Sequence, residues 1–402
     1  MKKYKYSVDS LKYLLNKDRK DFLNSIGNKG RKEIILGYND NSYTVNKNLE
    51  SIIESKIHSI SFFSGAGGLD IGAQLAGSKI ISCLDFDLDS IKTLKENKYF
   101  EHSEHFHNDI NLIKSSQFSK IIKKNNPEKL IVIGGPPCQP FSKAGYWVTH
   151  KNRLGGDDPR NMIDQYLKKI GELKPDGFIL ENVESLLHPK NEKAVLKLKE
   201  SIIKLGYNFI VYRADALEFG VPQKRKRVFF IASRKKINGE PIKTHGDVLE
   251  SHGELKLKPY ERVIDWIGHF DKREYFEIEE TISGKTYENE LFQIPPGKNY
   301  FALTERDGHP NPKFIANKRF WNFLLKLHPF QPSWTIAAQP GPWVGPFHWN
   351  NRRLRIPEIS AIQTFPSDYK FVGNRRSVQR QIGNAVPSIL GKKIIEHLIS
   401  NI

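Results

Sequence analysis

Residues 131–142 read Ile131-Val-Ile-Gly-Gly-Pro-Pro-Cys-Gln-Pro-Phe-Ser142, an apolar run that stops at two glycines and two prolines. β-branched residues followed by glycine and proline predict a buried strand that breaks into a rigid loop. Cys138 would then lie at the carboxyl end of that strand, the edge at which open α/β sheets bind ligands. A thiolate there is a strong nucleophile, although a lone cysteine is more commonly a buried structural residue. The prolines on both sides favour a reactive, presented Cys138.

A regular alternation of strand, glycine turn and helix extends outward from this stretch. We expect strands at residues 58–63, 80–85, 105–108, 130–133, 177–180, 208–213 and 227–232, and helices near 69–76, 88–97, 115–124, 161–172 and 191–204. Such alternation predicts an α/β fold with a doubly wound, mostly parallel sheet and helices on both faces. The short connection Gly220-Val-Pro predicts that the last two strands form an antiparallel pair at the sheet edge.

The segments on either side of this alternation differ from it in composition and periodicity. Residues 1–56 hold 12 Lys/Arg and 7 Asp/Glu, with short helical patterns at 10–15 and 21–26, and predict a basic N-terminal extension. From residue 235 the periodicity fades among prolines, tryptophans and glycines, which favours a smaller irregular domain at 235–374. Residues 375–402 end in an apolar helical pattern and are expected to complete the main domain, residues 57–234.

Composition limits the class of protein. The 402 residues carry a net charge of +18, a field that attracts polyanions, although a lysine-rich proteome would produce the same number. Two cysteines make no disulfide framework and indicate the cytoplasm. The chain has neither an apolar run of about 18 residues nor a signal peptide, so we expect a soluble protein that does not use a membrane.

A glycine turn and two acids predict a ligand at the sheet edge. Residues 62–69 read Phe62-Phe-Ser-Gly-Ala-Gly-Gly-Leu69, where glycines let a ligand approach the backbone. The dinucleotide fingerprint needs a glycine where Asp70 stands, so a pyrophosphate is not expected. Asp85 ends the next strand, where a ribose hydroxyl would be held, and Asp109 ends the following one. Together they favour a nucleoside with a non-phosphate tail, such as S-adenosylmethionine, although single loop acids are usually just solvated.

Charged residues on the later strands predict the chemistry. Glu181 follows an apolar strand and should emerge beside Cys138, where burial would raise its pKa and suit it to share a proton. A helix-capping or edge glutamate is the alternative. On a strand, Gln223, Arg225 and Arg227 would share one face, and the arginines could clamp a phosphate or a base carbonyl. A solvated basic edge is the ordinary explanation of such a run.

Five ordered motifs resemble those of the DNA (cytosine-5)-methyltransferases, and the resemblance covers about residues 57–233 and 350–390. They are Phe63-x-Gly65-x-Gly67, Pro137-Cys138-Gln139, Glu181-Asn182-Val183, Gln223-x-Arg225-x-Arg227 and Gln381-x-Gly383-Asn384-x-Val386-Pro387. Two positions depart from the family pattern: Asp85 stands where Glu is more usual, and Arg355-Ile-Pro357 replaces Thr-x-Arg.

The resemblance implies that S-adenosylmethionine donates a methyl group to C5 of a cytosine flipped out of double-stranded DNA. It implies that Cys138 bonds to C6, that Glu181 shares a proton with N3, and that Arg227, supported by Arg225, holds O2. Other DNA contacts would come from Gln139, Ser142 and Gln223, and the basic loop 142–160 would close over the base. The implied cofactor contacts are Phe63, Gly65, Ala66, Gly67, Asp85, Phe86 (stacked on the adenine), Asp109, Ile110, Pro137, Asn384 and Val386.

The irregular domain would recognise the DNA target, chiefly through residues 235–350. Plausible base readers there are Lys298, Asn299, Arg319 and Gln339. A chain of this size most often resembles the modification half of a restriction system. We therefore expect a monomer that functions alongside a restriction endonuclease.

Competing interpretations rest on shorter matches. His102-Ser103-Glu104 with Pro137-Cys138 partly fits the zinc deaminase signature, but its second cysteine would fall at Phe141, so no metal is expected. Gly284-Lys285-Thr286 lacks the upstream glycine of a phosphate loop. An RNA substrate, and a methyltransferase-like scaffold that binds DNA without catalysis, remain the alternative functions.

Overall fold

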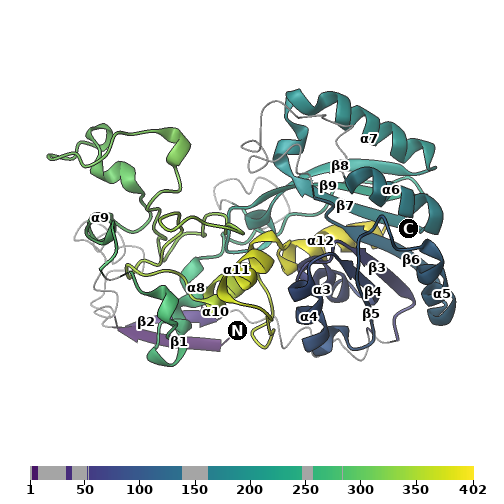
Figure 1. The fold of residues 1–402 in the computed structure, drawn as a ribbon, viewed down its shortest axis with the longest axis horizontal. Coiled ribbons are helices and arrows are strands. Elements are labelled where there is room, and N and C mark those ends of the chain that lie inside the picture. Colours follow the sequence, from purple (N-terminus) through teal and green to yellow (C-terminus); the bar gives the residue numbers. More distant parts are fainter. Residues whose placement is uncertain are drawn as a thin grey trace.

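The computed structural model describes residues 2–7, 33–38, 52, 54–137, 162–246, 257–282 and 284–402 (Figure 1). Within these residues the expected α/β sheet is present, with seven strands in the order β5-β4-β3-β6-β7-β9-β8. In chain order its strands are β3 (Ile57–Phe62), β4 (Lys79–Asp85), β5 (Glu104–His107), β6 (Lys129–Gly134), β7 (Gly177–Val183), β8 (Asn208–Asp215) and β9 (Lys226–Ser233).

One strand of the sheet, β9, runs in the opposite direction to the other six. β3 pairs in parallel with β4 and β6, β4 with β5, and β6 with β7. β9 is inserted between β7 and β8 and is antiparallel to both, so the expected antiparallel edge pair is confirmed. The prediction ended β7 at Leu180, but the strand continues to Val183 and therefore contains Glu181.

Helices cover both faces of the sheet because its central strands are buried on both sides. In β6, Ile131 and Ile133 face one apolar cluster, which includes α3 (Gly68–Leu75), α4 (Leu88–Glu96) and α12 (Ser388–Ile399). Leu130 and Val132 face the other, which includes α5 (Ser115–Asn125), α6 (Met162–Leu173) and α7 (Glu192–Lys204). This period-two division is the one that pleated strands impose.

The C-terminal helix α12 belongs to the sheet domain although it is distant in sequence. It lies directly on α3, where a Cβ added to Gly72 would be 2.8 Å from the backbone of Gly391. Two glycines at the crossing therefore let the helix backbones touch. α10 (Ile356–Ile362) and α11 (Arg375–Asn384) lead the chain back from the irregular segment to this position (Figure 1).

The irregular segment has a small core of its own. Its helices are α8 (Val263–Ile267) and α9 (Glu288–Gln293), joined by short 3-10 turns and loops that extend away from the sheet (Figure 1). Eight buried residues form its apolar cluster: Ile282, Leu291, Ile294, Tyr300, Phe301, Leu303, Leu324 and Phe347. At its base Arg352 bonds to Glu358 at 2.6 Å and Arg355 pairs with Glu280.

The N-terminal extension contributes a two-stranded antiparallel sheet, β1 (Lys2–Ser7) with β2 (Glu33–Tyr38). The helical patterns expected at residues 10–15 and 21–26 lie outside the described residues. Among the helices that are described, none has the length and apolar character needed to span a bilayer. Nor does the described part of the chain gather three or more His, Cys, Asp or Glu side chains in a possible metal site.

Candidate active site

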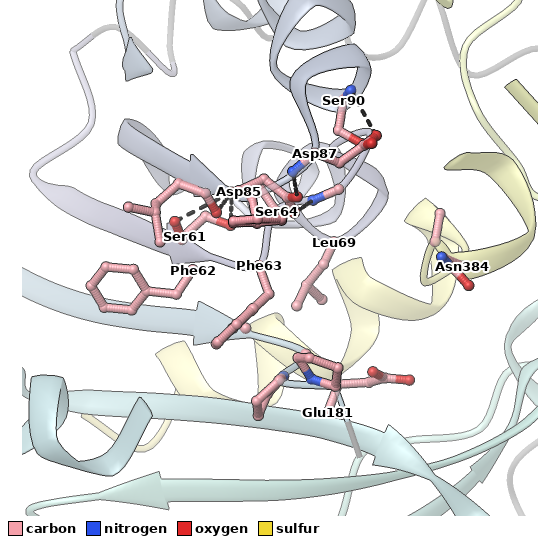
Figure 2. Close-up of a pocket in the computed structure, with 18 of the residues that line it drawn as sticks. Ser61, Phe62, Phe63, Ser64, Leu69, Asp85, Asp87, Ser90, Glu181 and Asn384 are labelled. Carbon is pink, nitrogen blue, oxygen red and sulfur yellow. Dashed lines mark hydrogen bonds between the residues drawn. The ribbon is translucent and has the colours of Figure 1, made fainter. Parts of the chain in front are cut away.

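A cavity of about 860 Å³ opens at the carboxyl ends of β3, β4, β5, β6 and β7. Parallel α/β sheets bind ligands at this edge, and the volume suits a small molecule. Figure 2 shows Asp85 and Asp87 on one side of the cavity, Glu181 on another and Asn384 on a third. Residues from both ends of the chain therefore meet around one space.

The glycine turn after β3 forms one wall of the cavity. Phe63, Gly65 and Gly67 all have left-handed backbone, with φ values of 57°, 53° and 80°. A Cβ added to Gly65 would meet nothing within 4 Å, so this backbone faces open space and a ligand can approach it. A Cβ on Gly67 would instead lie 2.7 Å from the Phe100 ring. Close packing against Phe100 therefore requires glycine at position 67.

Ala66 and Gly67 do not line the cavity, although both were expected among the cofactor contacts. Ala66 is 1% exposed, and its carbonyl accepts a hydrogen bond of 2.6 Å from the Tyr369 hydroxyl. Gly67 is the N-cap of α3. These two residues hold the turn in shape, whereas Phe63 and Gly65 are the predicted residues of the turn that line the space.

Asp85, at the end of β4, ties the turn to the next loop. Its carboxylate accepts hydrogen bonds from the backbone amides of Gly65 at 2.7 Å and Asp87 at 2.8 Å. Burial raises the pKa of Asp85, and the two amides oppose that shift. The following Phe86 is 74% exposed at the cavity, so its ring face is free to stack on a ligand.

The remaining predicted cofactor contacts also line the cavity. Asp109 and Ile110 follow β5, and the Asp109 carboxylate accepts two bonds of 2.8 Å from Asn111. Asn384 ends α11, Val386 follows it, and Pro137 lies on the loop after β6. Five separate chain segments thus converge there, as the sequence motifs indicated.

Sequence reasoning missed a link between α11 and the cavity wall. Asp87 caps α4 by accepting from the Ser90 amide at 3.1 Å, and it pairs with Arg380 at 2.7 Å. Arg380 lies on α11 and lines the cavity. The sequence can predict that Asp87 caps a helix. It cannot predict the partner Arg380, because that residue is 293 positions away and no local pattern connects the two.

Glu181 and Arg227 form an ion pair at the cavity, with Glu181 Oε1 2.9 Å from Arg227 Nε. Glu181 lies opposite Phe229 in the ladder, so Arg227 is its diagonal neighbour on the same face. Burial raises the pKa of Glu181, as expected, while the positive charge of Arg227 opposes the shift. The pair therefore holds a largely buried carboxyl group whose protonated form is favoured by burial and opposed by the guanidinium.

The chain that leads to Cys138 runs directly beside this pair. A Cβ on Gly135 would lie 2.8 Å from Glu181 Oε2, so glycine allows the close approach. Asn182 Nδ2 donates to the Pro136 carbonyl at 3.2 Å and fixes the loop. Cys138 is the residue after Pro137 in the chain, and Cys138, Gln139 and Ser142 lie outside the described residues.

Gln223 and Arg225 lie in the interior rather than at the cavity. The expectation that they share a strand face with Arg227 is wrong, because β9 begins at Lys226. Arg225 is 0% exposed and donates to the carbonyls of Ile336, Gly383 and Ala385 at 3.3, 2.7 and 3.0 Å. It supports the site from behind.

Gln223 is likewise fully buried. Its Nε2 donates to Gln363 Oε1 at 2.6 Å, and its Oε1 accepts from the Ile336 amide at 3.1 Å. The expected contact between Gln223 and DNA remains a prediction, and the side chain has no exposed surface in this conformation.

The sequence model of the C-5 cytosine-specific DNA methylase family matches residues 57–400. The chain belongs to this family. It is a DNA (cytosine-5)-methyltransferase, as the order of its motifs indicated.

Individual relatives agree with this assignment. The Type II methyltransferase M.SacI of Streptomyces achromogenes is 37% identical over 375 residues, covering 85% of this chain and 93% of that protein. M1.HphI of Haemophilus parahaemolyticus, also a Type II methyltransferase, is 30% identical over 349 residues, covering 85% and 86%. The solved structure of the Entamoeba histolytica methyltransferase EhMeth superposes with a TM-score of 0.53 at 17% identity, covering 86% of this chain and 98% of that one, which shows a shared fold.

The cavity of this methyltransferase fits the donor that its family uses, S-adenosylmethionine. Phe86 offers an exposed ring, Asp85 a carboxylate at the cavity wall, and Gly65 an open backbone. Asp70 also belongs to this cavity. In the sequence it was notable only as the residue that replaces a glycine of the dinucleotide fingerprint. Its Oδ2 is buried, without a hydrogen-bond partner in the described residues, and Asp70 lines the cavity.

Proposed function

We propose that this protein transfers the methyl group of S-adenosylmethionine to C5 of a cytosine flipped out of a specific duplex DNA site. The observation that carries the proposal is the Glu181–Arg227 ion pair, which lines the cavity beside the loop leading to Cys138. An acid, a guanidinium and a thiol are the groups that this reaction needs.

The residue types follow from the chemistry of the base. C5 of cytosine is a weak nucleophile, and attack by the Cys138 thiolate on C6 places electron density on C5. Glu181 donates a hydrogen bond to N3 and Arg227 to O2, which stabilises the developing charge. The bound cofactor supplies an electrophilic methyl group. Transfer of the C5 proton to solvent water and cleavage of the Cys138 Sγ–C6 bond, which expels the thiolate, then give 5-methylcytosine and free Cys138.

The raised pKa of Glu181 supports its role as proton donor. A carboxyl group with an ordinary pKa is ionised near neutrality and cannot donate to N3. Burial raises the pKa of Glu181 and favours the protonated form, while the charges of Arg227 and Arg225 oppose that rise. Glu181 can thus give up and recover a proton within one turnover.

Cofactor binding is assigned to the cavity residues that face its space. In this assignment Phe86 stacks on the adenine, Asp85 holds the ribose, and the backbone at Gly65 approaches the methionine part. Asp109 with Ile110 and Asn384 with Val386 close the two sides. Access to C6 requires base flipping, because the atom is stacked inside a duplex, and unstacking costs a few kcal/mol.

Target recognition is assigned to the irregular domain, residues 235–374, with 57–234 and 375–402 as the catalytic domain and 1–56 as an extension. Residues 305–322 are its most exposed part, and there Ile315 is 92% and Phe320 57% exposed. Lys318 and Arg319 adjoin these apolar side chains, a combination suited to a DNA groove.

The base readers suggested by sequence differ in their surroundings. Lys298, Arg319 and Gln339 are exposed, so they remain candidates. Asn299 is 4% exposed; it accepts from the Phe301 amide at 3.0 Å and donates to the Trp321 carbonyl at 2.8 Å. These bonds give Asn299 a structural role, and we no longer propose it as a reader.

The biological setting is proposed from the relatives, which are named Type II methyltransferases. We assign this protein to a restriction-modification system, as a cytoplasmic monomer that protects DNA from a partner endonuclease of the same specificity. Its methylation pattern would then coincide with the cleavage site of that endonuclease.

Methyl transfer from radiolabelled S-adenosylmethionine tests the reaction. The wild type should label duplex DNA, and Cys138→Ser should label it at least a hundredfold less while still binding the cofactor. Bisulfite sequencing should then locate 5-methylcytosine at one sequence. Labelling of RNA in preference to DNA, or undiminished activity of Cys138→Ser, would refute the proposal.

A second experiment tests the covalent step itself. Duplex DNA with 5-fluorocytosine at the target should trap a complex that survives denaturing electrophoresis, because fluorine cannot leave C5 as a proton does. The complex should form with the wild type in the presence of cofactor and be absent with Cys138→Ser. A wild-type enzyme that methylates DNA but traps nothing would exclude the adduct.

A further inference from the structure

Asp70 is a fully buried acid that the mechanism above does not use. It is the third residue of α3 and 0% exposed, and it lies behind the glycine turn that forms one wall of the cavity. The same cavity is lined by Asp85 and Asp109. The carboxyl group therefore faces the ligand space from the interior of the protein.

The hydrogen bonds of Asp70 leave half of its carboxyl group unsatisfied. Oδ1 lies 3.5 Å from Cys83 Sγ, which donates to it, and the Ser61 hydroxyl and the backbone amide of Asp70 itself also interact with the carboxyl group. Oδ2 is buried without a partner, and within the described residues no Lys or Arg pairs with Asp70. Burying an unpaired carboxylate costs free energy, so its position calls for a functional explanation.

Other acids at the cavity are compensated differently. Asp87 pairs with Arg380, and Glu181 pairs with Arg227. The region behind the turn instead holds Asp70 close enough to Asp85 that the charge of Asp85 contributes to raising the pKa of Asp70. This side of the cavity therefore carries uncompensated negative potential in the described structure.

A charge of this sign distinguishes the two forms of the cofactor. S-adenosylmethionine differs from its product, S-adenosylhomocysteine, only by the transferred methyl group and the sulfonium charge that this group confers. A buried anion acts on that charge through little water, where Coulomb interactions are strongest. We infer that the Asp70 carboxylate is a specificity-determining residue that favours binding of the charged methyl donor over the neutral product. The inference rests on the proposed function, because it requires the cofactor in this cavity.

The pKa of Asp70 makes the preference depend on pH. Burial raises this pKa to about 6, and Asp85 contributes to the rise. The other titratable groups facing Asp70 are Cys83 and Tyr369, and burial raises the pKa of both, so they stay neutral. Protonation of Asp70 below its pKa removes the negative charge, and the preference for the donor should fall with it.

Calorimetric dissociation constants for donor and product test the inference without measuring turnover. For the wild type at pH 7.5 the donor should bind more tightly. Asp70→Asn keeps the shape and should lower the ratio of product to donor dissociation constants about tenfold. Asp164→Asn is the matched control: it removes an exposed acid on α6 that pairs with Lys197, and should leave the ratio unchanged.

Two further measurements keep the test decisive. Sinefungin replaces the S-methyl sulfonium by a charged amine, so its affinity should fall with Asp70→Asn in parallel with that of the donor. In the wild type the ratio of product to donor dissociation constants should fall from pH 7.5 to pH 5. This pH series tests the inference even if Asp70→Asn does not fold. An unchanged ratio in Asp70→Asn, or a wild-type ratio independent of pH, would overturn the inference. A wild type that binds neither ligand would instead refute the proposed function.

Discussion

Glu181 and Arg227, the pair that we propose to be catalytic, show how a strand ladder can bring an acid and a guanidinium together. Their side chains share a face because the two residues are diagonal neighbours on antiparallel strands β7 and β9. A residue pair set by backbone hydrogen bonds is held more rigidly than one on loops. The proposed chemistry depends on this rigidity, since N3 and O2 of a base are separated by a fixed distance.

Replacement of Glu181 by Gln should slow methyl transfer about a hundredfold, the usual size of a lost general acid. Because the pKa of Glu181 is raised, the protonated wild-type donor should be lost as pH rises, and Gln should abolish that alkaline decrease in rate. Cofactor affinity should be unchanged. Glu184→Gln, an exposed neighbour on the same segment, serves as the control in single-turnover assays. Equal losses of rate and cofactor affinity in Glu181→Gln would contradict its role.

At the scale of elements, a buried polar cluster joins three parts of the chain that are distant in sequence. It consists of Gln223, Arg225 and Gln363, and it connects the segment before β9 with Ile336 in the irregular segment and with the end of α11. Gln363 Nε2 also donates to the Ile382 carbonyl at 2.7 Å. The cluster therefore sets the position of Asn384, which ends α11 at the cavity.

Substitution of Arg225 by Met should destabilise the protein strongly. The variant leaves the carbonyls of Ile336 and Gly383 without this buried donor, whereas the Ala385 carbonyl keeps its bond from Gln363 Nε2. We expect the free energy of unfolding to fall by about 3 kcal/mol. Urea denaturation followed by circular dichroism measures the change. Lys226→Met alters an exposed side chain next in the chain and should change stability by less than about 0.5 kcal/mol. Equal stability of the two variants would show that Arg225 does not support the fold.

At the scale of the whole molecule, the net charge of +18 predicts DNA binding that weakens steeply with salt. Fluorescence anisotropy of a labelled duplex at several salt concentrations gives the slope of log affinity against log salt. Alanine at both Lys318 and Arg319 should reduce that slope by about 2, one unit for each phosphate contact. Alanine at Lys190 and Lys193, which flank the start of α7, removes the same charge and should leave it unchanged. A flat wild-type titration would argue against broad phosphate contact.

The sequence by itself determined the alternation of strands and helices, the edge of the sheet that carries the site, and the residue types at that edge. These follow from local signals: period-two apolar runs, glycine turns and acids that end strands each occupy a few consecutive residues. The ordered motifs likewise identified the family before any contact was known.

Only the tertiary structure decided the roles that depend on contacts between distant segments. Arg225 and Arg227 are two residues apart and chemically alike, yet one is enclosed by three carbonyls and the other pairs with Glu181 at the cavity. The start of β9 at Lys226 separates them, and a pattern of alternating residues does not show where a strand begins. The properties of Asp70 were likewise decided by tertiary structure. Packing between α3, β3 and β4 buries this residue, leaves one of its oxygens unsatisfied and places it at the cavity, and no short stretch of sequence encodes that packing.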